Sequence, residues 1–254
     1  MLPLWLSEHL PTAFTFMLMA GVTATGCAVR GFSGFGAGLL MAPVFSLVMA
    51  PTDVVVVILF LNLLTTIQLL PGSLRSVDWG LVARLFVPTI LGMPIGLMLL
   101  HFVEPIVMRK TVAIIVILAA TVLLIGWVYR GPSGRLQDVI VGASSGFLTA
   151  IGGVGGPPVI LYLLSMPHMS PSVVRAVCVV FFSLTQISTL IPLGLTGSMT
   201  SKQAVIIVLL LPISVIASMV GTYLHVWSVG RHQASVRQAS LVLLLVIGVA
   251  ALLL

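Results

Sequence analysis

The chain has 254 residues, of which 59% are hydrophobic and 6% are charged, and its formal net charge at pH 7 is +6. Water-soluble domains carry about a quarter charged residues, so this composition and a mean hydropathy of +1.28 exclude a water-soluble protein. At roughly 20 residues per crossing, the length allows about eight to ten membrane segments and no separate soluble domain.

Long apolar runs without alternation favour α-helices over the strands of a membrane barrel, so we expect an all-α integral membrane protein. Loops are marked by clusters of glycine, proline and serine, and the cluster at 131–134 is the predicted linker between residues 1–130 and 131–254. In chain order, the expected segments are 11–30, 37–50, 53–71, 80–100, 107–129, 137–151, 154–166, 172–193, 202–225 and 235–254.

Two glycine-rich motifs interrupt the apolar sequence at matching places in the two halves. The first reads GFSGFGAG from residue 31, and the second reads GFLTAIGGVGGPP from residue 146. When the motifs are aligned on their first residues, their phenylalanines pair, and so do the closing prolines Pro43 and Pro158. Helix breaks at matching places in two halves of a membrane protein are typical of a transport site.

The match between the halves continues beyond the glycines. Residues 49–52 correspond to residues 169–172, Thr65 corresponds to Thr185, and Pro88 corresponds to Pro212. Each half contains five expected segments, which is an odd number, so the second half must enter the membrane the other way up. We therefore expect an inverted repeat of two five-segment halves.

Three expected segments, 37–50, 137–151 and 154–166, are too short to cross a bilayer. At 1.5 Å per residue each extends roughly 20 Å, against about 30 Å of hydrocarbon. The simplest arrangement is a pair of helical hairpins whose glycine tips end near the middle of the membrane, one from each side. Exposed backbone at that depth is tolerated only where it is buried in protein or lines a cavity.

Glycines at such tips let the backbone turn and let a ligand approach the peptide N–H groups. Helices starting near Ala37 and Val154 would direct unsatisfied N–H donors and partial positive charge at one point, forming an anion site from backbone. The alternative is that these glycines only permit close helix packing. The candidate residues are Gly34, Gly36, Ala37, Gly38, Gly152, Gly153, Val154, Gly155 and Gly156.

Polar residues inside two long segments are candidates for the wall of the same site. Segment 53–71 contributes Asn62 and Thr65, and segment 172–193 contributes Thr185 and Gln186. Polar groups at membrane depth usually face the bundle interior. There they line a site or hydrogen-bond neighbouring helices, and the sequence leaves both interpretations open.

The arginines raise a question of substrate contact and a question of orientation. Arg30 precedes the first glycine motif and Arg175 lies one helical turn after Pro171, so each either contacts an anion or marks a side of the membrane. The basic residues assigned to one side are Arg30, Arg75, Arg84, Arg130, Arg135, Arg175, Arg231 and Arg237. That side is expected to be cytoplasmic, which places both termini on the extracytoplasmic side of the inner membrane.

Carboxylates are expected at segment ends, as for Asp53, Asp78, Glu104 and Asp138. Their absence from the middle of segments argues against a proton relay and suits an anionic cargo, which a fixed negative charge would repel. The sequence shows no metal-ligand spacing, histidine-linked nucleophile or phosphate loop. We therefore expect no enzyme activity, cofactor or metal, and the basic loops orient the chain rather than bind nucleic acid.

The two glycine motifs and their prolines resemble those of the TauE/SafE sulfite-exporter family over nearly the whole chain, although Phe35 and Ala37 interrupt the first motif. The resemblance implies transport of a small sulfur-containing anion: sulfite, thiosulfate, a sulfonate or sulfoacetate. We expect a secondary transporter in the lipid bilayer that works by alternating access, and the alternative is a passive anion channel of the same architecture. The coupling ion, the direction of transport and the presence of a homodimer stay open.

Overall fold

The computed structural model describes residues 12–125, 134–166 and 169–228. These residues form nine α-helices, six of which contain a stretch long and apolar enough to cross a membrane. The six are α2 (Ala13–Ser33), α4 (Pro51–Ser73), α5 (Trp79–Phe102), α6 (Pro105–Leu124), α9 (Pro171–Leu195) and α10 (Ser201–Ser228). The remaining helices are α3 (Ala37–Val48), α7 (Arg135–Gly152) and α8 (Gly156–Leu164). The chain is therefore an all-helical, multi-pass membrane protein.

The helix lengths confirm two of the three predicted short segments and extend the third by three residues. Helices α3 and α8 have 12 and 9 residues, which is too short to cross. Helix α7 has 18 residues, about 27 Å of helix, so it is longer than the predicted segment 137–151, although it is not among the six helices long and apolar enough to cross. The helix begins at Arg135, two residues before the predicted segment, and the carboxylate of Asp138 in its first turn is buried with partners. The expected segment 235–254 lies outside the described residues.

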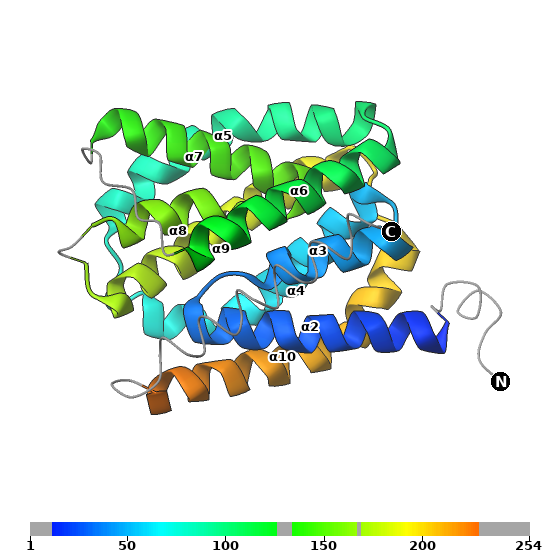
Figure 1. Cartoon of the computed structure of the whole chain (residues 1–254), viewed down its shortest axis with the longest axis horizontal. Helices are drawn as coiled ribbons and strands as arrows, with labels where there is room; N and C mark the ends of the chain where they lie inside the picture. The colour runs from blue at the N-terminus through cyan, green and yellow to red at the C-terminus, as the bar shows by residue number, and fades with distance from the viewer. Residues whose placement is uncertain (1–11, 126–133, 167–168, 229–254) are drawn as a thin grey trace.

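Two closely packed helix pairs lie on either side of a central pair (Figure 1). Helix α5 packs along α7 at one edge, α10 packs along α2 at the other, and α4 packs against α9 between them. A Cβ added at glycines of either edge pair would lie 2.0 to 2.2 Å from a carbonyl oxygen of the partner helix: Gly92, Gly142 and Gly146 in α5–α7, and Gly31 and Gly221 in α2–α10. The first glycine of each sequence motif, Gly31 and Gly146, therefore serves close helix packing.

The short helix α3 lies inside the bundle. Every residue from Ala37 to Phe45 is buried, which explains how this segment can be apolar on all sides. Helices at the edges instead expose large apolar side chains, such as Leu91 on α5 and Val208 on α10, which are 70% and 68% exposed. This distribution suits a surface that faces lipid rather than water.

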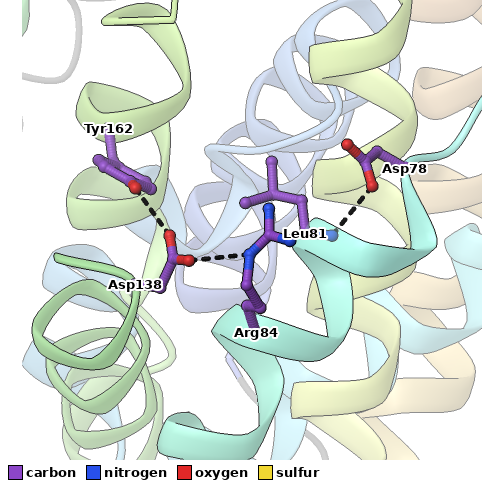
Figure 2. A network of polar contacts seen from close by, with 5 residues as sticks. All are labelled: Asp78, Leu81, Arg84, Asp138 and Tyr162. Carbon is purple, nitrogen blue, oxygen red and sulfur yellow. Dashed lines mark hydrogen bonds and ion pairs between the residues drawn. The ribbon is translucent and has the colours of Figure 1, made fainter. Parts of the chain in front are cut away.

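A charged network joins α5, α7 and α8 (Figure 2). Arg84 Nε donates to Asp138 Oδ2 at 2.9 Å, and the Tyr162 hydroxyl donates to Asp138 Oδ1 at 2.7 Å. Asp78 caps the start of α5 by accepting from the Leu81 N–H at 3.0 Å. Asp138 lies in the first turn of α7, at a segment end as predicted, and its carboxylate is fully partnered and only 5% exposed.

Candidate functional site

The first glycine bend lies between α2 and α3. Helix α2 ends where Gly34 adopts a φ of 86°, and Gly36, with a φ of 101°, precedes α3. Both values lie in the left-handed region that glycine adopts without steric penalty. Helix α3 begins at Ala37, as predicted. Its first N–H groups have no carbonyl partner within the helix, so they are available to a ligand.

The second glycine bend lies between α7 and α8 and differs from the prediction. Helix α7 ends at Gly152 and is followed by Gly153, with a φ of 69°, and α8 begins at Gly156 rather than near Val154. The Val154 N–H donates to a carbonyl near the end of α7 at 3.3 Å. Pro157 and Pro158, at the start of α8, have no N–H. The second bend therefore offers fewer amide donors than the first.

The two bends lie in contact, since a Cβ added at Gly38 would lie 2.1 Å from the carbonyl oxygen of Gly153. Beside this contact is a cavity of about 30 Å³, with room for about two water molecules. The residues that line this cavity are Arg30, Phe35, Gly36, Gly38, Leu39, Leu59, Asn62, Thr149, Gly153, Val154, Gly155, Gly156, Phe182 and Gln186. Separate bends in the sequence thus meet at one place in the fold.

Most predicted site residues line this cavity, and five of them lie elsewhere. Gly34 packs against Arg175 instead, and Gly152 packs against Val112. The hydroxyls of Thr65 and Thr185 donate to carbonyls of their own helices, each at 2.9 Å. Ala37 is buried at the start of α3 but is not among the lining residues.

Sequence reasoning missed the apolar part of the wall. Phe35, Leu39, Leu59 and Phe182 line the cavity beside the polar groups, as does Thr149. Phe35 carried a usable signal because it stands between two glycines of the first motif. The other apolar residues have no local pattern that separates them from core residues.

Arg30 brings a buried positive charge to the cavity. The residue is 2% exposed and lies within α2, not in a loop. Its Nη2 donates to Thr66 Oγ1 at 2.7 Å and to the Asn62 carbonyl oxygen at 3.4 Å, and its Nε has no partner among the described residues. Among the described residues, the ion pair joins Arg84 to Asp138, so Arg30 has no carboxylate partner there. A buried guanidinium with neutral partners favours an anion beside it.

Asn62 and Gln186 bring two further buried polar groups to the cavity, one from α4 and one from α9. The residues are 3% and 4% exposed, and the Oδ1 of Asn62 and the Oε1 of Gln186 have no partner in the described part of the chain. Rotation of a side-chain amide by 180° exchanges its oxygen and nitrogen. Each amide can therefore offer N–H donors to the same place.

Arg175 lies near the first bend but does not line the cavity. Its Nη2 donates to the Gly31 carbonyl oxygen at 2.7 Å, close to the end of α2. A cation is favourable at a helix C-terminus, where carbonyl groups lack intrahelical partners. The geometry thus assigns Arg175 to holding α9 against α2.

Comparison with known proteins agrees with the resemblance noted in the sequence. The profile of the family described as "Sulfite exporter TauE/SafE" matches residues 17–251. A relative from Cupriavidus necator, named as a probable sulfite/organosulfonate exporter TauE, is 24% identical over 217 residues, covering 80% of this chain and 81% of the relative. No solved structure matches the chain. Because the family match spans most of its length, the protein belongs to the TauE/SafE sulfite-exporter family of membrane transport proteins.

Proposed function

We propose that this protein is a secondary transporter that exports a small sulfur-containing oxyanion, such as sulfite or an organosulfonate, across the inner membrane. The observation that carries the proposal is Arg30, a buried guanidinium whose recorded partners are neutral, on a cavity between the two glycine bends. Family membership and the name of the Cupriavidus necator relative support the substrate class and the direction.

The polar groups around the cavity suit an anion. Arg30, Asn62 and Gln186 can all donate hydrogen bonds, and no carboxylate is among the lining residues that the structure describes. The start of α3 adds backbone N–H groups and the partial positive charge of a helix N-terminus. An oxyanion would exchange its hydration shell for these fixed donors.

The cavity volume supports a cycle with more than one conformation. About 30 Å³ is too small for a sulfonate, which is larger than two water molecules, so the walls must separate to admit substrate. Each edge pair combines one helix from each half of the sequence, α2 with α10 and α5 with α7. We therefore propose that the edge pairs move as units against the central helices α4 and α9, in place of one sequence half rocking against the other.

The arrangement of the helices also supports the proposed inverted repeat of residues 1–130 and 131–254. The sequence alignment of the halves pairs α2 with α7, α4 with α9 and α5 with α10, and under this pairing the two edge pairs correspond to each other. Helices α4 and α9 both begin at a proline, Pro51 and Pro171. The proposed orientation, with the arginine-rich side cytoplasmic, still rests on the positive-inside rule.

The decisive experiment is counterflow in proteoliposomes that contain the purified chain. Radiolabelled methanesulfonate is expected to exchange against unlabelled methanesulfonate with saturable kinetics, as a carrier requires. A flux that rises linearly with concentration and shows no counterflow would replace the carrier with a passive channel. The comparison with a relative named as an exporter lends that alternative no support.

A glycine variant tests whether the contact between the bends matters. Gly38→Ala is expected to reduce counterflow by about tenfold or more, because its methyl group would lie 2.1 Å from the Gly153 carbonyl oxygen and push the bends apart. Gly21→Ala in α2 is the matched control, since an added Cβ there meets nothing within 4 Å. Equal transport by both variants, at equal amounts in the membrane, would contradict the assigned site.

A further inference from the structure

We propose that the cavity selects its substrate by charge, accepting singly charged oxyanions such as a sulfonate or hydrogen sulfite and rejecting dianions of the same size. The inference rests on the anion site proposed above and goes beyond it. Its basis is the number of charges around the cavity: Arg30 contributes one positive charge, and the other lining residues are uncharged.

No other residue that lines the cavity neutralises the charge of Arg30 or adds a second positive charge. Its hydrogen-bond partners are a hydroxyl and a backbone carbonyl, and the ionisable groups that interact with it, Cys27 and Cys178, are fully buried thiols. Arg175, the other arginine near the first bend, donates to the Gly31 carbonyl and does not line the cavity. The formal charge that the lining side chains present to a substrate is therefore +1.

A singly charged anion beside Arg30 would form a neutral pair in a medium of low dielectric constant. A dianion in the same place would leave one negative charge buried without a partner, which is strongly unfavourable. Helix N-termini cannot supply a full second charge, since each contributes roughly half a charge. Here the second bend contributes less still, because Pro157 and Pro158 at the start of α8 have no N–H.

The two unpartnered amide oxygens, on Asn62 and Gln186, do not indicate a cation site. Arg30 Nη2 lies 3.4 Å from the backbone carbonyl oxygen of Asn62, so a metal cation bound by these amides would lie close to a buried guanidinium. Like charges at short range in a low-dielectric interior repel strongly. Both amides therefore act as donors to an anion.

The apolar side of the cavity gives an independent reason for the same preference. Phe35, Leu39, Leu59 and Phe182 occupy part of the wall, and none of these side chains can donate a hydrogen bond. Sulfate has four oxygen atoms to satisfy, so one of them would face this apolar surface without a partner. A sulfonate places its carbon substituent there and keeps its three oxygens for the donors.

Methanesulfonate and sulfate are the matched probes, because a methyl group in the first stands where the second has its extra charged oxygen. Isothermal titration of the purified full-length chain in detergent is expected to show methanesulfonate binding about tenfold or more tightly than sulfate. Sulfate binding as tightly as methanesulfonate would overturn the charge selection and leave the proposed anion site intact. Binding of neither probe would overturn both.

Variants of Arg30 test whether its charge balances the bound anion. Arg30→Gln is expected to weaken methanesulfonate binding by about tenfold or more, because no charge then balances the anion, whereas Arg30→Lys keeps the charge and the preference. Arg75→Gln removes an exposed charge and is expected to change neither value. Methanesulfonate affinity that is unchanged in Arg30→Gln would overturn the inference. If that variant does not fold, the wild-type ratio and Arg30→Lys still decide the question.

Discussion

Gln186 shows at the scale of a single residue how a proposed binding group differs from a structural one. Its Oε1 is buried without a partner in the described part of the chain, whereas Gln203 Nε2 donates to Asp53 Oδ1 at 2.5 Å and to the Ser198 carbonyl at 3.0 Å. A buried polar atom without a partner reduces stability by roughly 1–3 kcal/mol. Such a cost is typical of a site that keeps a group free for its ligand.

Substitution of these two glutamines by methionine is therefore expected to change stability in opposite directions. Gln186→Met should raise the free energy of unfolding by about 1 kcal/mol while weakening anion binding, because it removes the unpartnered atom. Gln203→Met should lower the free energy of unfolding by about 1–3 kcal/mol, because Asp53 and Ser198 lose a donor. Thermal unfolding in detergent and methanesulfonate titration measure both effects. A loss of stability in Gln186→Met would contradict the assigned role.

Helix α8 illustrates the scale of an element, since nine residues cannot form a stable helix alone. Its Tyr162 hydroxyl donates to Asp138 on α7, and Asp138 also pairs with Arg84 on α5, whose side chain is 52% exposed (Figure 2). This network holds α8, and with it the second glycine bend, in place against the edge pair.

Asp138→Asn is expected to lower the free energy of unfolding by about 1–2 kcal/mol. The substitution removes the charge that Arg84 pairs with. The loss of stability is moderate because water can solvate the half-exposed arginine. Asp78→Asn is the matched control, because asparagine caps the Leu81 N–H as well as aspartate does and should leave stability nearly unchanged. Equal midpoints of thermal unfolding for the two variants would show that the network does not hold the helices together.

The whole molecule is organised by its two glycine-packed edge pairs. This arrangement predicts that equivalent glycine substitutions in the two pairs reduce stability by similar amounts. An added Cβ at Gly92 of α5 or at Gly221 of α10 would lie 2.0 Å from a carbonyl oxygen of the opposing helix. Gly92→Ala and Gly221→Ala are therefore expected to reduce stability by similar amounts, about 1–3 kcal/mol each. Gly72→Ala, with nothing within 4 Å of the added Cβ, is the control. Thermal unfolding that responds to one edge variant alone would argue against equivalent pairs.

Local features of the chain were predictable from the sequence. The first bend was placed correctly, with α3 starting at Ala37, because glycine's access to positive φ depends on one residue and its neighbours. The start of α8 was placed two residues too early, although Pro157 and Pro158 mark it, since proline is favoured at the first helical positions. Helix α7 begins two residues before the predicted segment 137–151 and ends one residue after it, because apolar patterning does not locate helix ends to the residue.

The sequence by itself determined that this protein crosses a membrane many times, because the length and polarity of each run decide whether it is stable in lipid. Tertiary structure decided which polar groups have partners. Asp138 is neutralised by Arg84, Thr65 is satisfied by its own helix, and Arg30 meets only neutral groups in the described part of the chain. These differences arise from contacts between helices far apart in the sequence, and a buried charge becomes a binding group only where packing supplies it with no opposite charge.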